Sequence, residues 1–521
     1  MTKQTFLKGT ITLVLAGLVI RLLGFVNRIV VARLMGEEGV GLYMMAVPTL
    51  ALTITMTQLG LPVAISKRVA EAEARNEQSR VKQILVVSLA VTGVLSLVFT
   101  AGMMALSHWV ASTLLTDERT MYPLMAIAPI VPIVAISSVI RGYFQGKQNM
   151  RPSAISQLIE QVVRISLVAV LTSLFLPYGV EFAAAGAMIS VVLGELASLV
   201  YMIILFKKQK TVAIRKGFMQ SLSRGKSTLY DLMSIALPTT GSRLVGSVSY
   251  FFEPIVVAQS LAIAGVATVV ATQQYGELTG FAMPLLFLPS FITHALSISL
   301  VPAISEAAAK KQTRLIHYRL QQALRLCMVT GGLSVVVLFL YAEPLMELMY
   351  GSSSGARFIE LMAPLFLLYY FQGPLQSTLQ ALDMAKAAMI NSIIGTVLKI
   401  VAIFALATQA SIGIMGVAMA IMASTILVTL LHFFTVAKTI GFVFYFRDFI
   451  KTIIAMGAAV AAGSVWFVVQ HEQLLSSTLL SIVWTSLLYV ILMVAFKLIK
   501  RSDVNRIPFV GKWLFTFMPK G

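Results

Sequence analysis

The chain of 521 residues is 58% hydrophobic and only 12% charged, with a mean hydropathy of +0.88. Soluble proteins carry about 25% charged residues, so this composition excludes a soluble enzyme and indicates an integral membrane protein. One cysteine, Cys327, and five scattered histidines are too few for an internal disulfide framework or a Cys-based metal centre, so we expect no metal site.

Fourteen apolar segments are long enough to cross a bilayer, which takes about 20 residues in a helix. They predict an all-α polytopic membrane protein with fourteen transmembrane helices. The first segment is too long for a cleavable signal peptide and has no small-residue cleavage site, so we expect it to remain as the first helix. In chain order the segments are 10–33, 41–66, 83–110, 121–144, 154–177, 182–206, 229–258, 276–303, 320–342, 358–380, 389–409, 412–436, 449–470 and 474–497.

The distribution of positive charge predicts the orientation. If the N-terminus is inside, 32 of the 40 Lys and Arg residues fall in inside segments and only three in outside segments. Because cytoplasmic loops are rich in Lys and Arg, this bias predicts that both termini are cytoplasmic. The net charge of +19 is then loop charge that faces the cytoplasm and anionic lipid headgroups, and it does not indicate nucleic acid.

The chain contains a weak internal repeat. The first span carries the sequence Arg-Leu-Leu-Gly from Arg21, and the seventh carries Arg-Leu-Val-Gly from Arg243. At a constant offset of 235, Arg164 in the fifth span aligns with Lys399 in the eleventh. The repeat predicts an N-lobe (1–206), a basic cytoplasmic linker (207–228), a C-lobe (229–436), two further helices (437–497) and a basic cytoplasmic tail (498–521).

Six helices per lobe is an even number, so the repeat predicts two lobes of the same orientation, related by an axis along the membrane normal. Such repeats are typical of transporters, whose substrate site lies between the halves near the middle of the membrane.

Cations inside predicted spans need an explanation, because each costs about 2.5–3.5 kcal/mol at the bilayer centre. Arg21 and Arg28 are two helical turns apart and share a face with Gly17 and Gly24, which would permit close approach of a helix or a ligand. The alternative is that these side chains reach the lipid headgroups, which is easier for Arg28 near the end of its span. The hypothesis is a substrate-binding cationic cavity of Arg21, Arg28, Arg243 and Lys399.

Three acids also lie inside spans. Glu160 and Arg164 have the spacing of an ion pair on one helix face, which is either structural or functional. Glu195 and Glu253 would neutralise a cavity arginine or carry a coupling proton. Three prolines that remove backbone hydrogen bonds within spans are candidate hinges, namely Pro48, Pro254 and Pro284.

No motif points to an enzyme. The sequence has no phosphate-binding loop after a strand, no nucleophile–base constellation and no loop long enough for a catalytic domain. We therefore expect no catalytic residues and no cofactor, apart from a possible coupling ion (Na⁺ or H⁺) or use of the membrane potential.

The first two spans resemble a known family. Three segments carry the resemblance: Lys8 through Arg28, Gly36-Glu37-Glu38-Gly39, and Gly60 to Lys67. They are similar to sporulation members of one transporter group. That group is the polysaccharide-exporter branch of the multidrug/oligosaccharidyl-lipid/polysaccharide exporter superfamily. It is related to MurJ-type lipid II flippases, which have fourteen helices and a cationic cavity between two six-helix lobes.

The resemblance implies a function. A flippase of this kind would move a polyprenyl-pyrophosphate-linked peptidoglycan precursor such as lipid II to the outer leaflet by alternating access, with the polyprenyl tail along the last two helices. It also implies spore cortex synthesis, the bacterial cytoplasmic membrane around the developing spore, and peptidoglycan polymerases as partners. Arg21 and Arg28 fit the family's arginines in the first helix.

Four functions compete. Clustered cations suit the diphosphate of a lipid-linked oligosaccharide, because charge-assisted bonds strengthen where water is excluded. Export of another lipid-linked polysaccharide is an alternative, as is cation-coupled multidrug export, which would favour embedded acids over the five embedded bases seen here. A membrane-embedded glycosyltransferase would need a larger outside loop. The sequence therefore favours the flippase.

Overall fold

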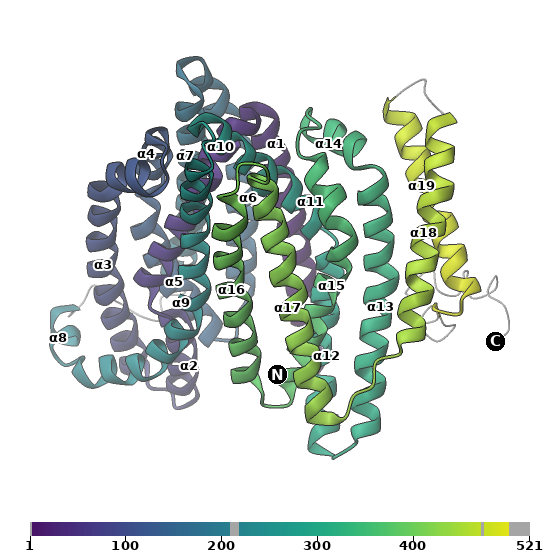
Figure 1. The fold of residues 1–521 in the computed structure, drawn as a ribbon. Helices are drawn as coiled ribbons and strands as arrows, with labels where there is room; N and C mark the ends of the chain where they lie inside the picture. The colour runs from purple at the N-terminus through teal and green to yellow at the C-terminus, as the bar shows by residue number, and fades with distance from the viewer. Residues whose placement is uncertain (1–2, 209–217, 470–473, 500–521) are drawn as a thin grey trace. The chain divides into compact units, whose positions relative to one another are not determined.

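The computed structural model describes residues 3–208, 218–469 and 474–499, and every regular element within these ranges is a helix (Figure 1). Helices suit a membrane because each satisfies its own backbone N–H and C=O groups where water is absent. The all-α fold class is confirmed.

Contacts divide the chain into two compact units. Unit 1 comprises residues 1–280 and 407–414, and unit 2 comprises 281–406 and 415–521. Unit 1 contains α1 (Lys3–Gln58), α2 (Leu61–Ala74), α3 (Gln78–Trp109), η1 (Val110–Leu114), η2 (Glu118–Thr120), α4 (Met121–Ile127), α5 (Ile130–Gly146), α6 (Arg151–Phe175), η3 (Leu176–Tyr178), α7 (Val180–Lys208), α8 (Phe218–Ser223), α9 (Lys226–Ile263) and α10 (Thr268–Gly276).

The π-helix η4 (Glu277–Ala282) carries the chain from unit 1 into unit 2. Unit 2 contains α11 (Met283–Phe287), α12 (Ser290–Ala309), α13 (Thr313–Leu340), α14 (Ala342–Tyr350), α15 (Ala356–Ala381), α16 (Ala385–Ala407), α17 (Ile414–Ile440), α18 (Phe446–Val469) and α19 (Leu474–Ala495). The predicted lobes divide at 207–228, whereas contacts place α9 and α10 with the N-terminal helices. The lobe boundaries rest on the sequence repeat and stay a prediction.

Twelve helices within the described ranges are long and apolar enough to cross a membrane. They correspond in order to the predicted spans from the third (83–110) to the fourteenth (474–497). The first predicted span and most of the second lie on α1. The multi-pass architecture is confirmed, while the total of fourteen spans and the cytoplasmic position of both termini stay predictions.

The first two predicted spans are not separated by the expected loop. Instead, α1 consists of two helices that meet at a kink at Gly36, whose φ of 65° and ψ of −171° are open to glycine but strained for other residues. The predicted span 41–66 is wrong in its last residues, because the chain turns at Leu59 (φ 44°) and Gly60 (φ 63°) and α2 begins at Leu61.

The predicted span 276–303 is also interrupted. It is divided among η4, α11 and α12, with Pro284 in the first turn of α11 and Pro289 as the N-cap of α12. Proline has no backbone N–H, so it fits a helix start better than a helix interior.

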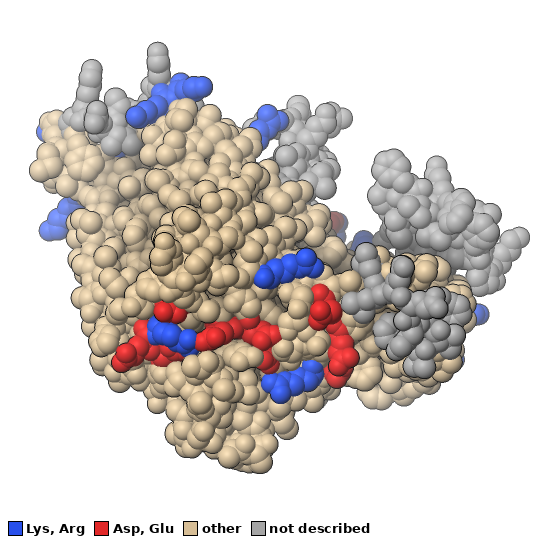
Figure 2. All heavy atoms as spheres, turned by 90° about the horizontal axis from the view of Figure 1, so that it is seen from above, with Lys and Arg blue, Asp and Glu red and all other residues tan. Residues whose placement is uncertain are grey.

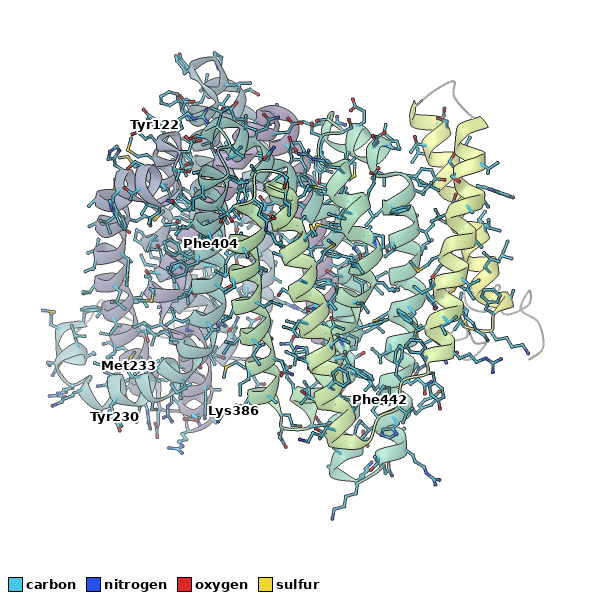
Figure 3. The ribbon with its side chains drawn as sticks, in the orientation of Figure 1. Tyr122, Tyr230, Met233, Lys386, Phe404 and Phe442 are labelled. Carbon is cyan, nitrogen blue, oxygen red and sulfur yellow. The ribbon has the colours of Figure 1, made fainter. Side chains whose placement is uncertain are left out.

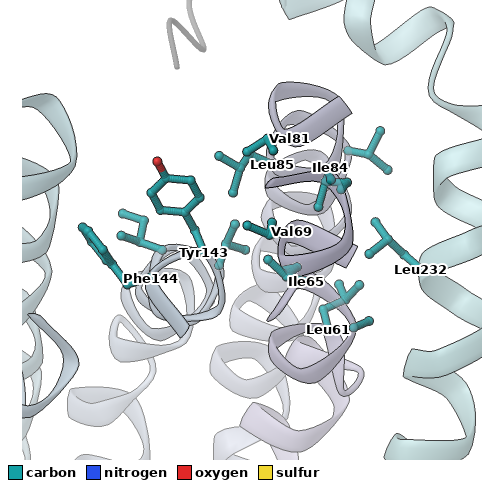
Figure 4. Packing of buried hydrophobic residues seen from close by; sticks show 14 of the residues in the cluster. Leu61, Ile65, Val69, Val81, Ile84, Leu85, Tyr143, Phe144 and Leu232 are labelled. Atoms are coloured by element: carbon teal, nitrogen blue, oxygen red, sulfur yellow. The ribbon is translucent and has the colours of Figure 1, made fainter. Parts of the chain in front are cut away.

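A buried apolar cluster fixes the helices at one end of unit 1. It joins α2, α3, α5 and α9, and its labelled members in Figure 4 are Leu61, Ile65, Val69, Val81, Ile84, Leu85, Tyr143, Phe144 and Leu232. Side chains of α2 at i, i+4 and i+8 point to the same face, which explains why one helix can meet three neighbours.

Large apolar side chains also remain on the outside of both units, as lipid contact requires. Leu97 on α3 is 68% exposed and Phe404 on α16, labelled in Figure 3, is 54% exposed.

Candidate transport site

Three of the four predicted cavity cations lie in unit 1. Arg21 and Arg28 are on α1, and Arg243 is on α9, which packs against α1. A hydrogen bond of 2.8 Å between the hydroxyls of Thr55 and Ser247 joins α9 to the part of α1 that follows Gly36, whereas Arg21 and Arg28 lie in the part that precedes it. All three arginine side chains are exposed, and no ion pair to them is found among the described residues.

The glycines beside these arginines face open space. A Cβ atom added at Gly17, Gly24, Gly241 or Gly246 would meet no atom within 4 Å. Gly17 and Gly24 therefore do not accommodate a neighbouring helix, which is one of the two predicted reasons for their presence. Room for a ligand remains as the other reason.

Arg28 and Glu253 share a neighbour. Both lie close enough to Tyr250 of α9 to act on it electrostatically. Glu253 is half-buried and precedes Pro254 inside α9. The balancing of an α1 arginine by Glu253 stays a prediction.

Lys399 lies elsewhere, on α16 in unit 2, and its side chain is half-buried and makes a contact of its own. Of the candidate hinges, Pro48 lies inside α1, Pro254 lies inside α9, and Pro284 begins α11.

A buried ion network joins α5, α6 and α7. The guanidinium of Arg141 donates to Glu195 Oε1 at 2.8 Å and to Ser198 Oγ at 3.2 Å, and it lies 3.8 Å from Glu160 Oε2. Arg164 donates to the other oxygen of Glu160, so the predicted pair on α6 is present. Glu195 is only 4% exposed, which makes Arg141 its necessary counter-charge.

The sequence prediction missed Arg141, because it placed the residue in the inside segment 141–153. In the structure α5 continues to Gly146, so Arg141 lies within the helix. The sequence shows only that Glu195 has no cation on its own helix face and needs one from another helix, and it does not single out Arg141.

A second polar cluster lies at the opposite end of unit 1 from the apolar cluster, on the face where Figure 2 shows acidic side chains in a band with basic ones among them. Arg119 pairs with Asp117 at 2.8 Å and also with Glu38. Thr272 donates to Asp117 at 2.8 Å, and Gln273 donates to Glu37 at 3.0 Å. These bonds tie α1, η2 and α10 together.

Glycines permit an unusually close crossing of α1 and α10 at this cluster. A Cβ at Gly41 would lie 2.0 Å from the carbonyl oxygen of Thr272, and a Cβ at Gly276 would lie 2.1 Å from that of Glu37. Only glycine allows the two backbones to approach so closely. No group of three His, Cys, Asp or Glu residues that could hold a metal occurs within the described ranges.

Comparison with known proteins agrees with this architecture. The family model described as polysaccharide biosynthesis protein matches residues 6–308, and the MatE model matches 278–405. Stage V sporulation protein B of Bacillus subtilis (strain 168) is 58% identical over 98% of this chain and 99% of its own length. Sporulation protein YkvU of the same organism is 30% identical over 84% of this chain and 96% of its own.

Lipid II flippase MurJ of Bacillus subtilis is 25% identical over 76% of each chain. A solved structure of lipid II flippase MurJ in an inward closed conformation superposes with a TM-score of 0.71 at 15% identity, covering 93% of this chain and 98% of that one. An inward-facing multidrug resistance MATE family transporter superposes with a TM-score of 0.64 at 16% identity, covering 81% and 94%. These two structures show the fold.

The chain therefore belongs to the polysaccharide biosynthesis protein family, within the multidrug/oligosaccharidyl-lipid/polysaccharide exporter superfamily of multi-pass membrane transporters.

Proposed function

We propose that this protein is a flippase that moves a polyprenyl-pyrophosphate-linked peptidoglycan precursor such as lipid II from the cytoplasmic to the outer leaflet, for spore cortex synthesis. The observation that carries the proposal is the set of three exposed arginines on α1 and α9, with open space at the glycines beside them. The names of the sporulation and MurJ relatives supply the substrate class and the cellular setting.

The chemistry of the arginines suits a pyrophosphate. Arg21, Arg28 and Arg243 each present a planar fork of donors that can bind two phosphate oxygens at once. No acid in the described chain forms an ion pair with them, so their charge is available to a ligand. Lys399 of α16 stays a proposed substrate contact.

The proposed mechanism is alternating access. The lobes would open to either side while the headgroup stays near the middle of the membrane, with bending at Pro48, Pro254 and Pro284. The polyprenyl tail would stay in lipid along α18 and α19. Release would follow from a competing ion, from the membrane potential, or from protonation of Glu195 or Glu253. The pairing of Glu195 with Arg141 supports a charge-balancing role for Glu195.

Two observations favour a second candidate, a multidrug exporter. The MatE model matches residues 278–405, and the fold resembles that of a MATE transporter. A cationic drug, however, would be repelled by exposed arginines. The two candidates therefore differ in the charge of the ligand that the α1–α9 arginines would accept.

A binding experiment separates the two candidates. The purified protein should bind a fluorescent polyprenyl pyrophosphate disaccharide, and unlabelled polyprenyl pyrophosphate should displace it, whereas ethidium should not. If ethidium binds and displaces the lipid while polyprenol lacking pyrophosphate binds as well as the full ligand, the flippase proposal is wrong.

A further inference from the structure

A basic pocket of about 560 Å³ lies within unit 2. It is formed by α13, by the start of α18 and by the residues that follow α19. Its volume is in the range of sites that hold small molecules or lipid headgroups. The lining residues are Tyr318, Gln321, Gln322, Arg325, Tyr445, Arg447, Asp448, Lys451 and Lys497.

The pocket carries a strong positive charge. Four cations line it, Arg325, Arg447, Lys451 and Lys497, against one carboxylate, Asp448. Arg325 is only 6% exposed, and it contributes from a position well inside α13. A pocket lined by four cations attracts an anion, because opposite charges attract more strongly away from water.

The backbone around the pocket holds these cations in place. Lys451 Nζ donates to the carbonyl oxygen of Phe496 at 3.1 Å, which fastens the start of α18 to the end of α19. Lys497, with a φ of 60°, turns the chain directly after α19. The first turn of the long helix α18 opens into the same pocket, and the positive end of its dipole favours an anion there.

Apolar surface next to the pocket points to a lipid. Phe446, Ile450 and Ile454 of α18 lie at i, i+4 and i+8 and are 64%, 47% and 53% exposed. This stripe begins one residue before Arg447. The rim carries Tyr318 and Tyr445, which are 51% and 56% exposed, and tyrosine is typical of the boundary between lipid and water.

The predicted topology agrees with this reading. The pocket residues come from three separate segments, 304–325, 437–451 and 497–521, and the charge distribution predicts each of them on the cytoplasmic side. Basic pockets between membrane helices on that side are suited to anionic headgroups. We propose that this pocket binds the headgroup phosphate of an anionic phospholipid, at a site separate from the arginines of α1 and α9.

Native mass spectrometry of the full chain in neutral detergent tests the proposal. Dioctanoyl-phosphatidylglycerol should bind with one molecule per chain, and the double variant Arg447→Gln/Lys497→Gln should weaken this binding about tenfold or more. Both residues are exposed, so the variant keeps the buried Arg325 and should fold. The control Lys386→Gln/Lys438→Gln removes the same charge from exposed positions of unit 2 outside the pocket and should bind as the unchanged protein does.

Two further arms identify the source of the phosphate. Inorganic phosphate should compete only at concentrations far above those of the lipid, and zwitterionic dioctanoyl-phosphatidylcholine should bind weakly. Equal affinity for inorganic phosphate, or equal binding by both double variants, would overturn the lipid proposal. Selective binding of polyprenyl pyrophosphate at the pocket would also overturn the proposal, because the pocket would then belong to the transport path. The transport proposal is tested separately, through Arg21 and Arg243.

Discussion

Two groups of arginines in unit 1 differ in their surroundings, and this difference separates structural from functional charge. Arg141 and Arg164 pair with Glu160 and Glu195, and their side chains are 21% and 19% exposed. The arginines on α1 and α9 are exposed, with no ion pair in the described chain. Hydropathy alone predicts that the arginines of the second group lie inside apolar spans. It does not predict the ion pair of Arg141, because its partner Glu195 is 54 residues away and only packing brings the two together.

Removal of an exposed arginine should affect transport and leave folding unchanged. Arg21→Ala or Arg243→Ala should each reduce transport about tenfold or more, because a charge-assisted bond to phosphate is lost. Arg→Lys at either position should retain partial activity, since lysine keeps the charge but cannot form the bidentate fork. Protein abundance should stay near normal. Arg151→Ala, which removes an exposed arginine elsewhere in unit 1, is the control and should leave transport unchanged. Full activity of both alanine variants would show that Arg21 and Arg243 are not part of the substrate site.

Removal of Arg141 should instead affect stability. Arg141→Met leaves Glu195 buried without its counter-charge, which should cost about 3–5 kcal/mol and lower the melting temperature in detergent. The double variant Arg141→Met/Glu195→Met should recover much of the loss, because no buried charge is left unpaired. Lys310→Met, which removes an exposed pair with Glu306, should change the melting temperature little. A single variant as stable as the unchanged protein would show that the network is not needed for folding.

At the scale of helices, apolar length predicted where the chain crosses the membrane but not where it bends. The spans from the third onward could be predicted because each is a separate apolar run. The kink at Gly36 and the division of the span 276–303 at Pro284 and Pro289 arise from local backbone properties that apolar length does not register. The α1–α10 crossing could not be predicted either, because Gly41 and Gly276 meet residues more than 200 positions away.

The glycine crossing predicts a strong effect of a single methyl group. Gly276→Ala should force α10 away from α1, because its Cβ would lie 2.1 Å from the carbonyl oxygen of Glu37 and 2.7 Å from the amide nitrogen of Gly41. We expect destabilisation of about 1–3 kcal/mol, measured as a lower melting temperature. Gly93→Ala on α3, where a Cβ meets no atom within 4 Å, is the matched control. Equal melting temperatures for the two variants would contradict the observed crossing.

The orientation of the helices can be tested by cysteine labelling. Ser223→Cys, at the last residue of α8, should be labelled only from the cytoplasmic side, and Ser353→Cys, between α14 and α15, only from outside. Both positions are exposed, whereas the native Cys327 is buried and should not react. Labelling of both engineered cysteines from outside intact cells would disprove the predicted topology.

At the scale of the whole molecule, membrane insertion, helical class and family follow from the sequence, and the two compact units do not. The internal repeat predicts lobes that divide near 207–228, and this stays a prediction about duplicated halves. The compact units divide instead at residue 280, because α9 and α10 contact the N-terminal helices. Contacts between helices far apart in the chain cannot be predicted from residue patterns alone.

The most direct test of the central claim is a flipping assay in proteoliposomes with a headgroup-labelled polyprenyl pyrophosphate disaccharide. The purified protein should move labelled headgroups between leaflets, so that an impermeant quencher reaches nearly all of them. In empty liposomes, and with the Arg21→Ala/Arg243→Ala double variant, the quencher should reach only the headgroups that began in the outer leaflet. If the unchanged protein behaves like empty liposomes, or if the double variant flips the lipid at the normal rate, the protein is not a flippase that binds its substrate through these arginines.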